Sequence, residues 1–292
     1  MALAVGLLTA CEKEISVDEP DNGVAVTDDQ GNVLPTKKFT FTLKGDFSDN
    51  WKPVTRGYLQ ADGKDLTDVW VLDYMNGNLV QQLHQDDNTA EDFGMPTMSL
   101  AYGSHHVYVI ASRSQGATLD TENHLIKFTK VLDTFYKDYE VSVVATSNGN
   151  RAVTLDRVVT RLRLTFTDAV DVNAATLNIT PHTWYFGWDY VNGMPADAKT
   201  DQTNAINIPA NQLGNTGLQA NLYGFSTATA WTTDVVFNSK KSDQTVIGSA
   251  SIANASFKSN RISEYEGPLF NAGGALTLSL NSTWDDAYEG VW

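Results

Sequence analysis

VVTRLRLTFT, residues 158–167, is the stretch of sequence that decides the fold class. Leu162, Leu164 and Phe166 would point to one face of an extended chain. The residues between them, Arg163 and Thr165, would point to the opposite face. An alternation with a period of two is typical of a half-buried β-strand. The stretch therefore predicts a strand with one face in a hydrophobic core.

Similar strand-like segments lie on both sides of this stretch and are separated by turn residues. Among them, Asn76-Gly77 predicts a tight hairpin turn between two strands. Residues 125–139 are ambiguous, because their apolar residues recur with helical spacing, but their β-branched and aromatic content favours two strands. The other strand candidates are residues 39–43, 69–74, 79–80, 107–111, 141–145, 177–179, 206–208, 218–225, 235–237 and 276–280.

Short strands with turn residues at close intervals predict antiparallel β-sandwiches rather than alternating strands and helices. The polar residues 147–150, SNGN, predict a domain boundary near residue 150. No sequence repeat relates the two halves. We expect an all-β protein with two tandem antiparallel β-sandwich domains, residues 37–150 and 151–292.

The composition is that of a folded and strongly acidic protein. The chain has 292 residues, of which 42% are hydrophobic, and this is enough to bury a sizeable core. Its formal net charge is −15. Nucleic-acid binding needs Lys and Arg gathered on one face, and binding to anionic lipid by charge needs basic segments. We therefore expect no nucleic-acid partner and no electrostatic attachment to a membrane.

The only cysteine, Cys11, ends a short apolar run and is followed by an acidic segment. A helix of residues 1–10 would rise only about 15 Å, half of a hydrocarbon core of about 30 Å, so it would not span a membrane. A single thiol forms no internal disulfide. One interpretation is an ordinary buried cysteine, which behaves as a small apolar residue.

The other interpretation is lipidation, because Leu8-Thr9-Ala10-Cys11 resembles the lipobox of bacterial lipoproteins. The resemblance implies that residues 1–10 are a signal peptide and that Cys11 carries acyl chains. Each buried methylene contributes about 0.8 kcal/mol, so two or three chains would hold a domain on a membrane. Signal peptides begin with positive charges, and Met1-Ala2-Leu3 has none, so we expect the signal to be incomplete.

Residues 11–36 predict an acidic tether between the lipid and the first domain. In lipoproteins of the Bacteroidetes type, acidic residues directly after the lipidated cysteine resemble the signal for export to the outer face of the outer membrane. A tether and an export signal are both compatible with this segment.

Patterns for catalysis and metal binding are weak. Zinc needs three or four close ligands, but the five histidines are mostly scattered and form no His-Glu-x-x-His motif. His105 and His106 would face opposite sides of a strand and could not bind one ion together. Ser104 lacks the second glycine of a nucleophile elbow. We expect no enzyme, no cofactor and no metal site.

Residues 184–190, WYFGWDY, concentrate aromatic side chains. Trp184, Tyr185, Trp188 and Tyr190 could form an aromatic contact surface for another subunit or a glycan, since such rings anchor interfaces. The alternative is that these rings fill a sandwich core. No other feature of the sequence supports a glycan partner.

Four segments, taken in order, carry a family resemblance: DLTDVW (65–70), FGMP (93–96), AYGSHH (101–106) and LDRVVTRL (155–162). Together with Cys11 they resemble the fimbrillin and fimbrial-anchor lipoproteins of Bacteroidales, most closely the anchor subunits of the minor fimbria. The resemblance implies two transthyretin-like β-sandwich domains and acyl chains on Cys11. It also implies a surface location on the cell outer membrane, in or at the base of a fimbria, with other fimbrial subunits as partners.

In that family, subunits join by strand exchange. A stalk subunit loses its first strand after cleavage at an arginine, and a strand of a neighbour fills the groove. Arg56, after the expected strand at 39–43, is a candidate cleavage point, although a solvated loop arginine is the alternative. Only residues 281–292 follow the last expected strand, which leaves little length for a donor strand and favours an anchor.

We therefore expect a lipid-anchored structural subunit that attaches a surface fimbria to the outer membrane, ends its growth and joins its neighbour by β-strand addition. The alternatives are a glycan-binding surface lipoprotein and, less favoured, a surface hydrolase.

Overall fold

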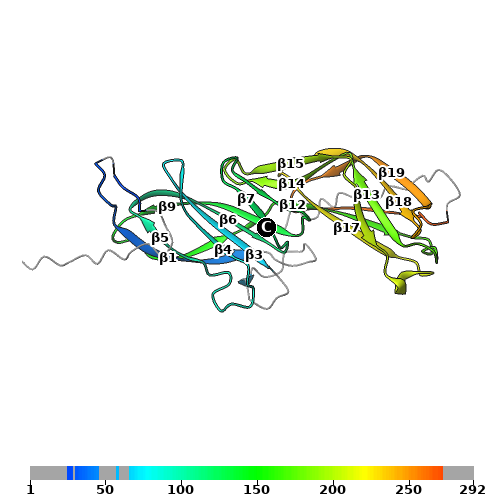
Figure 1. Ribbon diagram of the computed structural model, residues 1–292, viewed down its shortest axis with the longest axis horizontal. Coiled ribbons are helices and arrows are strands. Elements are labelled where there is room, and N and C mark those ends of the chain that lie inside the picture. The colour runs from blue at the N-terminus through cyan, green and yellow to red at the C-terminus, as the bar shows by residue number, and fades with distance from the viewer. Residues whose placement is uncertain (1–24, 29, 46–56, 59–65, 272–292) are drawn as a thin grey trace, which may run out of the picture.

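The computed structural model describes residues 25–28, 30–45, 57–58 and 66–271 (Figure 1). Within these ranges the chain is all-β, with strands and one short 3-10 helix, η1 (Ala210–Gln212). The predicted fold class is confirmed at this level. Cys11, Arg56, the signal peptide at 1–10, most of the tether at 11–36 and the strand expected at 276–280 lie outside the described residues. No helix in the described part of the chain is long and apolar enough to cross a membrane.

Two sheets pack face to face in the first half of the chain (Figure 1). One has the strand order β11-β9-β6-β3-β4, and in the other β1 pairs with β10, β2 and β5. The bounds are β1 (Thr36–Gly45), β2 (Gly57–Tyr58), β3 (Asp68–Met75), β4 (Asn78–Gln85), β5 (Thr97–Ala101), β6 (Gly103–Ser112), β9 (Thr134–Val143), β10 (Asn150–Thr154) and β11 (Asp156–Arg157).

The core between these sheets follows from alternation along the strands. In β1, Phe39, Phe41 and Leu43 point inward and are fully buried, while the threonines between them are partly exposed. Val71 of β3 and Val109 of β6 face them from the other sheet. Side chains of one strand alternate between the two faces, so a single strand supplies both the core and the outer surface.

The hairpin between β3 and β4 has the predicted turn. Asn76 and Gly77 both have positive φ angles, 52° and 77°, and Met75 pairs with Asn78. Positive φ at both central residues defines the type I′ turn, which matches the twist of the two strands. The hairpin prediction is confirmed.

Three further sheets have the orders β17-β12-β20, β16-β13-β18-β19 and β15-β14-β8-β7. Their strands are β7 (Thr118–Asp120), β8 (Leu125–Lys127), β12 (Val159–Phe166), β13 (Thr176–Pro181), β14 (Thr183–Asp189), β15 (Met194–Thr200), β16 (Asn204–Asn207), β17 (Leu218–Phe225), β18 (Trp231–Lys240), β19 (Val246–Phe257) and β20 (Ile262–Gly267). Residues 125–139, ambiguous in the sequence, contribute β8 and the start of β9, so the favoured strand interpretation is confirmed.

The stretch that decides the fold class is the middle strand of its sheet. Leu162, Leu164 and Phe166 of β12 are buried, and the polar residues between them are partly exposed. β12 runs antiparallel to β17 and parallel to β20. The prediction of a strand with one buried face is confirmed.

Among the described residues, most strand pairings are antiparallel, as predicted, but two are parallel. β1 pairs with β10, and β12 with β20, in parallel. Two strands can pair in parallel only if a long connection brings the chain back to the end of the sheet at which the first strand began. Several strands lie between the members of each pair along the chain, so that connection is available.

The two halves of the chain share strands and a core. β10 and β11 pair with β1 and β9 of the first half, and the β7–β8 hairpin joins β14 of the second. One core cluster contains Leu72 and Tyr108 together with Trp188. The change of sheet partners falls between β11 and β12, a few residues after the boundary expected near residue 150. The division into two transthyretin-like domains remains a proposal.

Candidate functional site

The aromatic stretch at 184–190 lies largely inside the protein. Trp184, Trp188 and Tyr190 are 0%, 3% and 0% exposed. Trp184 Nε1 donates a hydrogen bond to the carbonyl oxygen of Tyr223 at 2.9 Å, and its ring meets Phe257 edge-on. The predicted contact surface is therefore wrong for these three residues, because their rings face the core.

Tyr185, the fourth residue of that predicted surface, is half-buried. Its ring packs edge-on against Trp231, with 5.4 Å between the ring centroids. A single partly covered ring offers little of the flat area that stacking on a sugar would need.

Tyrosine side chains join the two halves. The hydroxyls of Tyr190 and Tyr74 share a hydrogen bond of 2.9 Å, and the Tyr136 hydroxyl donates to the Tyr190 carbonyl oxygen at 2.6 Å. The ring of Tyr108 lies 5.6 Å from that of Tyr190, measured between centroids. Tyr190 thus has a structural role, holding β3, β6 and β9 against the end of β14.

A buried ion pair lies where the chain passes from the first half to the second. Arg157 donates to both carboxylate oxygens of Asp133, through Nε at 2.7 Å and Nη2 at 3.0 Å. Nη1 donates to the side-chain oxygen of Asn260 at 3.0 Å. The guanidinium also lies over the ring of Phe135. Arg157, one of two arginines in the 155–162 segment, therefore connects three distant parts of the chain, a role that its sequence context did not indicate.

His105 is buried in the first core, whereas His106 faces outward, as their positions on a strand predict. Nδ1 of His105 lies 2.7 Å from Asp73 Oδ1, and Nε2 lies 2.8 Å from the carbonyl oxygen of Ala101. Both partners accept hydrogen bonds, so a protonated imidazole that donates from both nitrogens satisfies them. Burial acts to lower the pKa of His105, but the hydrogen bond and charge of Asp73 and the Ala101 carbonyl outweigh it, so that the pKa is raised above 6.5.

This raised pKa predicts a pH-dependent contribution to stability. A group whose pKa is higher in the folded than in the unfolded state stabilises the fold fully below its unfolded pKa, and the contribution disappears as the pH rises through the folded pKa. The free energy of unfolding should therefore fall from pH 6.5 upward more steeply in the wild type than in His105→Gln. Urea denaturation at a series of pH values measures the difference.

His182→Gln is the control for this pH prediction, because it changes an exposed histidine. It should retain the wild-type pH dependence. Parallel curves for the wild type and His105→Gln would contradict the prediction.

β1 is the element on which assembly by strand exchange would depend. β10 lies along one edge, and β5 and β2 pair along the other. Its three buried side chains, Phe39, Phe41 and Leu43, are 0% exposed, and each contributes about 1.5–3 kcal/mol by burial. Without β1, the strands that pair with it would have unpaired backbone groups, and the core between the two sheets would have empty side-chain pockets. Arg56, the candidate cleavage point after β1, lies outside the described residues.

Comparison with known proteins identifies solved structures with a similar fold. No family model matches the sequence, and no curated protein matches it significantly. A proposed cell adhesion protein from Bacteroides ovatus superposes with a TM-score of 0.50 at 12% identity, over 84% of this chain and 96% of that chain. A proposed adhesin from the same species gives a TM-score of 0.49 at 13% identity, over 85% and 88%.

The fimbrial anchor protein Mfa2 from Porphyromonas gingivalis gives a TM-score of 0.46 at 7% identity, over 79% of this chain and 89% of that chain. At these identities the likeness concerns the fold alone. The fold shared with the Bacteroides ovatus cell adhesion protein includes nearly all of that protein.

Proposed function

We propose that this protein is a structural subunit of a surface fimbria, held by lipid on the outer membrane, where it anchors the fibre and ends its growth. The observation that carries the proposal is the all-β fold, in which 84% of this chain superposes on 96% of a proposed cell adhesion protein from Bacteroides ovatus. Two features of the sequence support the same role. They are the lipobox-like residues before Cys11 and the four family-like segments between residues 65 and 162, in their order along the chain. The protein acts by binding its neighbours, without catalysis.

The environment of β1 supports assembly by β-strand addition. A neighbour's strand that joins this sheet gains backbone hydrogen bonds along an edge and places alternate side chains in pockets. The side chains of Phe39, Phe41 and Leu43 indicate how large and how apolar such pockets are. In the anchor, β1 remains in place with both of its edges paired, so the strand of the adjacent subunit pairs along an outer edge of this sheet, such as that of β10.

The glycan-binding alternative requires exposed aromatic rings, but three of its four candidate residues are buried. Trp184, Trp188 and Tyr190 are buried, so a sugar cannot stack on their faces without unfolding of the second half. No contact of the described residues favours this function over the structural one.

Membrane fractionation and mass spectrometry of the mature N-terminus test the proposed function. The wild type should be found in the outer membrane with acyl groups on Cys11. Cys11→Ala should be lost from that fraction, and cells that carry it should release their fibres. Arg56→Ala is the matched control, since it changes the candidate cleavage point and leaves the lipobox intact; it should remain in the membrane.

Two results would contradict this proposed function. One is a wild-type protein that is unacylated and freely secreted. The other is a deletion strain whose fibres keep the wild-type length and attachment.

A further inference from the structure

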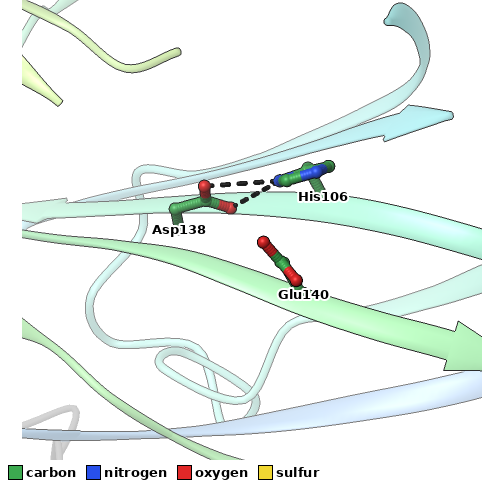
Figure 2. Close-up of side chains that lie close together, drawn as sticks. All are labelled: His106, Asp138 and Glu140. Atoms are coloured by element: carbon green, nitrogen blue, oxygen red, sulfur yellow. Dashed lines mark hydrogen bonds and ion pairs between the residues drawn. The ribbon is translucent and has the colours of Figure 1, made fainter. Parts of the chain in front are cut away.

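Three side chains of metal-ligating type meet on the outer face of the sheet, on β6 and β9. His106 lies directly opposite Glu140 in the strand register, and Asp138 is two residues before Glu140. Residues two apart on a strand point to the same face, so all three side chains project to the same side. Figure 2 shows the Glu140 carboxylate beside the hydrogen-bonded pair of His106 and Asp138.

The distances between these groups suit a small cation. Nδ1 of His106 lies 3.1 Å and 3.3 Å from the two oxygens of Asp138. One ligand atom from each of the three residues lies within 4.8 Å of the others. Around a tetrahedral zinc ion with bonds of about 2.0–2.1 Å, neighbouring ligand atoms are about 3.3 Å apart. His106 and Asp138 already have this spacing, and the Glu140 carboxylate has only a short distance to move.

Glu140 is free to make that movement. Within the described residues, no hydrogen bond or ion pair holds its carboxylate. The His106 and Asp138 side chains are 50% and 36% exposed. An ion can therefore reach the cluster from solvent, and water can complete its coordination.

The local charge favours a cation. Tyr108 lies beside the cluster, its ring stacked against that of His106. In the described part of the chain, Asp138 pairs with His106 rather than with a lysine or arginine. The cluster therefore has an uncompensated negative charge.

We propose that His106, Asp138 and Glu140 form a binding site for a divalent transition-metal ion, and that zinc fits it best. One imidazole nitrogen and two carboxylate oxygens are ligands that zinc accepts, with water in the fourth position. Calcium and magnesium prefer oxygen ligands alone, so the histidine disfavours them. This inference is independent of the proposed fimbrial role.

The sequence did not predict this site, because the ligands are not close along the chain. His106 and Asp138 are 32 residues apart, and only the pairing of β6 with β9 brings them together. The histidine next to His106 in the sequence, His105, faces the core and cannot be a ligand of the same ion.

Isothermal titration of the full-length protein with zinc chloride, after removal of chelators, tests the site. The wild type should bind one zinc ion that His106→Ala does not bind. Glu140→Gln, which keeps the side-chain shape, should weaken binding by about tenfold or more, since even groups that only support a ligand cost this much.

His182→Ala is the matched control. His182 and Asp201 form another exposed pair, with Nδ1 3.0 Å from Oδ1, but within the described residues no third ligand joins them. This variant should bind zinc like the wild type. Zinc bound by Cys11 would be common to all four proteins, so differences among them report the proposed site.

The proposal is overturned if the wild type binds no zinc, or if His106→Ala binds it with unchanged stoichiometry and affinity. Equal loss in His106→Ala and His182→Ala would also overturn it. All three substitutions are on the surface, and circular dichroism should show wild-type folding for each.

Discussion

Arg157→Ala is expected to lower the free energy of unfolding by about 3–5 kcal/mol, because removal of one partner leaves a buried charge without compensation. Arg157 and Asp133 are each 2% exposed in their side chains. The substitution also removes the hydrogen bond to Asn260, which belongs to the second half of the chain. Urea denaturation followed by tryptophan fluorescence measures the loss.

Lys137→Ala is the matched control for Arg157→Ala. Lys137 pairs with Asp156 at 3.0 Å, but the two side chains are 40% and 70% exposed. Exposed pairs contribute about 0–1 kcal/mol, so this variant should remain close to the wild type. The double variant Asp133→Leu with Arg157→Met should recover much of the lost stability, since apolar replacements of a buried pair are often neutral. A loss below about 1 kcal/mol in Arg157→Ala would contradict the expectation.

Trp184→Ala is expected to destabilise the protein by about 3–5 kcal/mol, the cost typical of truncating a large buried aromatic side chain. The ring is fully buried against Phe257 and donates to the Tyr223 carbonyl. Gly224 lies so close that a Cβ there would be 2.5 Å from the ring, so the surrounding packing is tight. Thermal and urea denaturation both measure the effect.

Tyr185→Ala is the control for Trp184→Ala, because it truncates the next ring of the same strand, which is only half-buried. It should cost clearly less than Trp184→Ala. Equal losses would contradict the structural role assigned to Trp184. A glycan assay with Trp184→Ala would therefore report on folding and not on recognition.

The sequence predicted which residues form strands better than it predicted which strands pair. Alternation in 158–167 and in the segment around Phe41 identifies a buried face, because side-chain direction depends only on local geometry. It contains no information about the neighbour across the sheet. The parallel pairing of β1 with β10, and of β12 with β20, therefore could not be predicted from the local pattern.

The same limit applies to sites that several strands build together. The contacts of Arg157 with Asp133, and of His106 with Asp138, join residues 24 and 32 positions apart. Each residue is unremarkable in its own segment. The aromatic stretch at 184–190 shows the converse: a conspicuous local composition that the fold uses for packing.

The two-sided pairing of β1 has a mechanical consequence. Since β1 is hydrogen-bonded along its length to strands on both edges, tension on the chain ahead of Thr36 acts parallel to the strand. The load is then carried in shear by many bonds at once, rather than by opening them one after another from an end. The sheet that contains β1 is thereby built to resist traction applied from the N-terminal side of that strand.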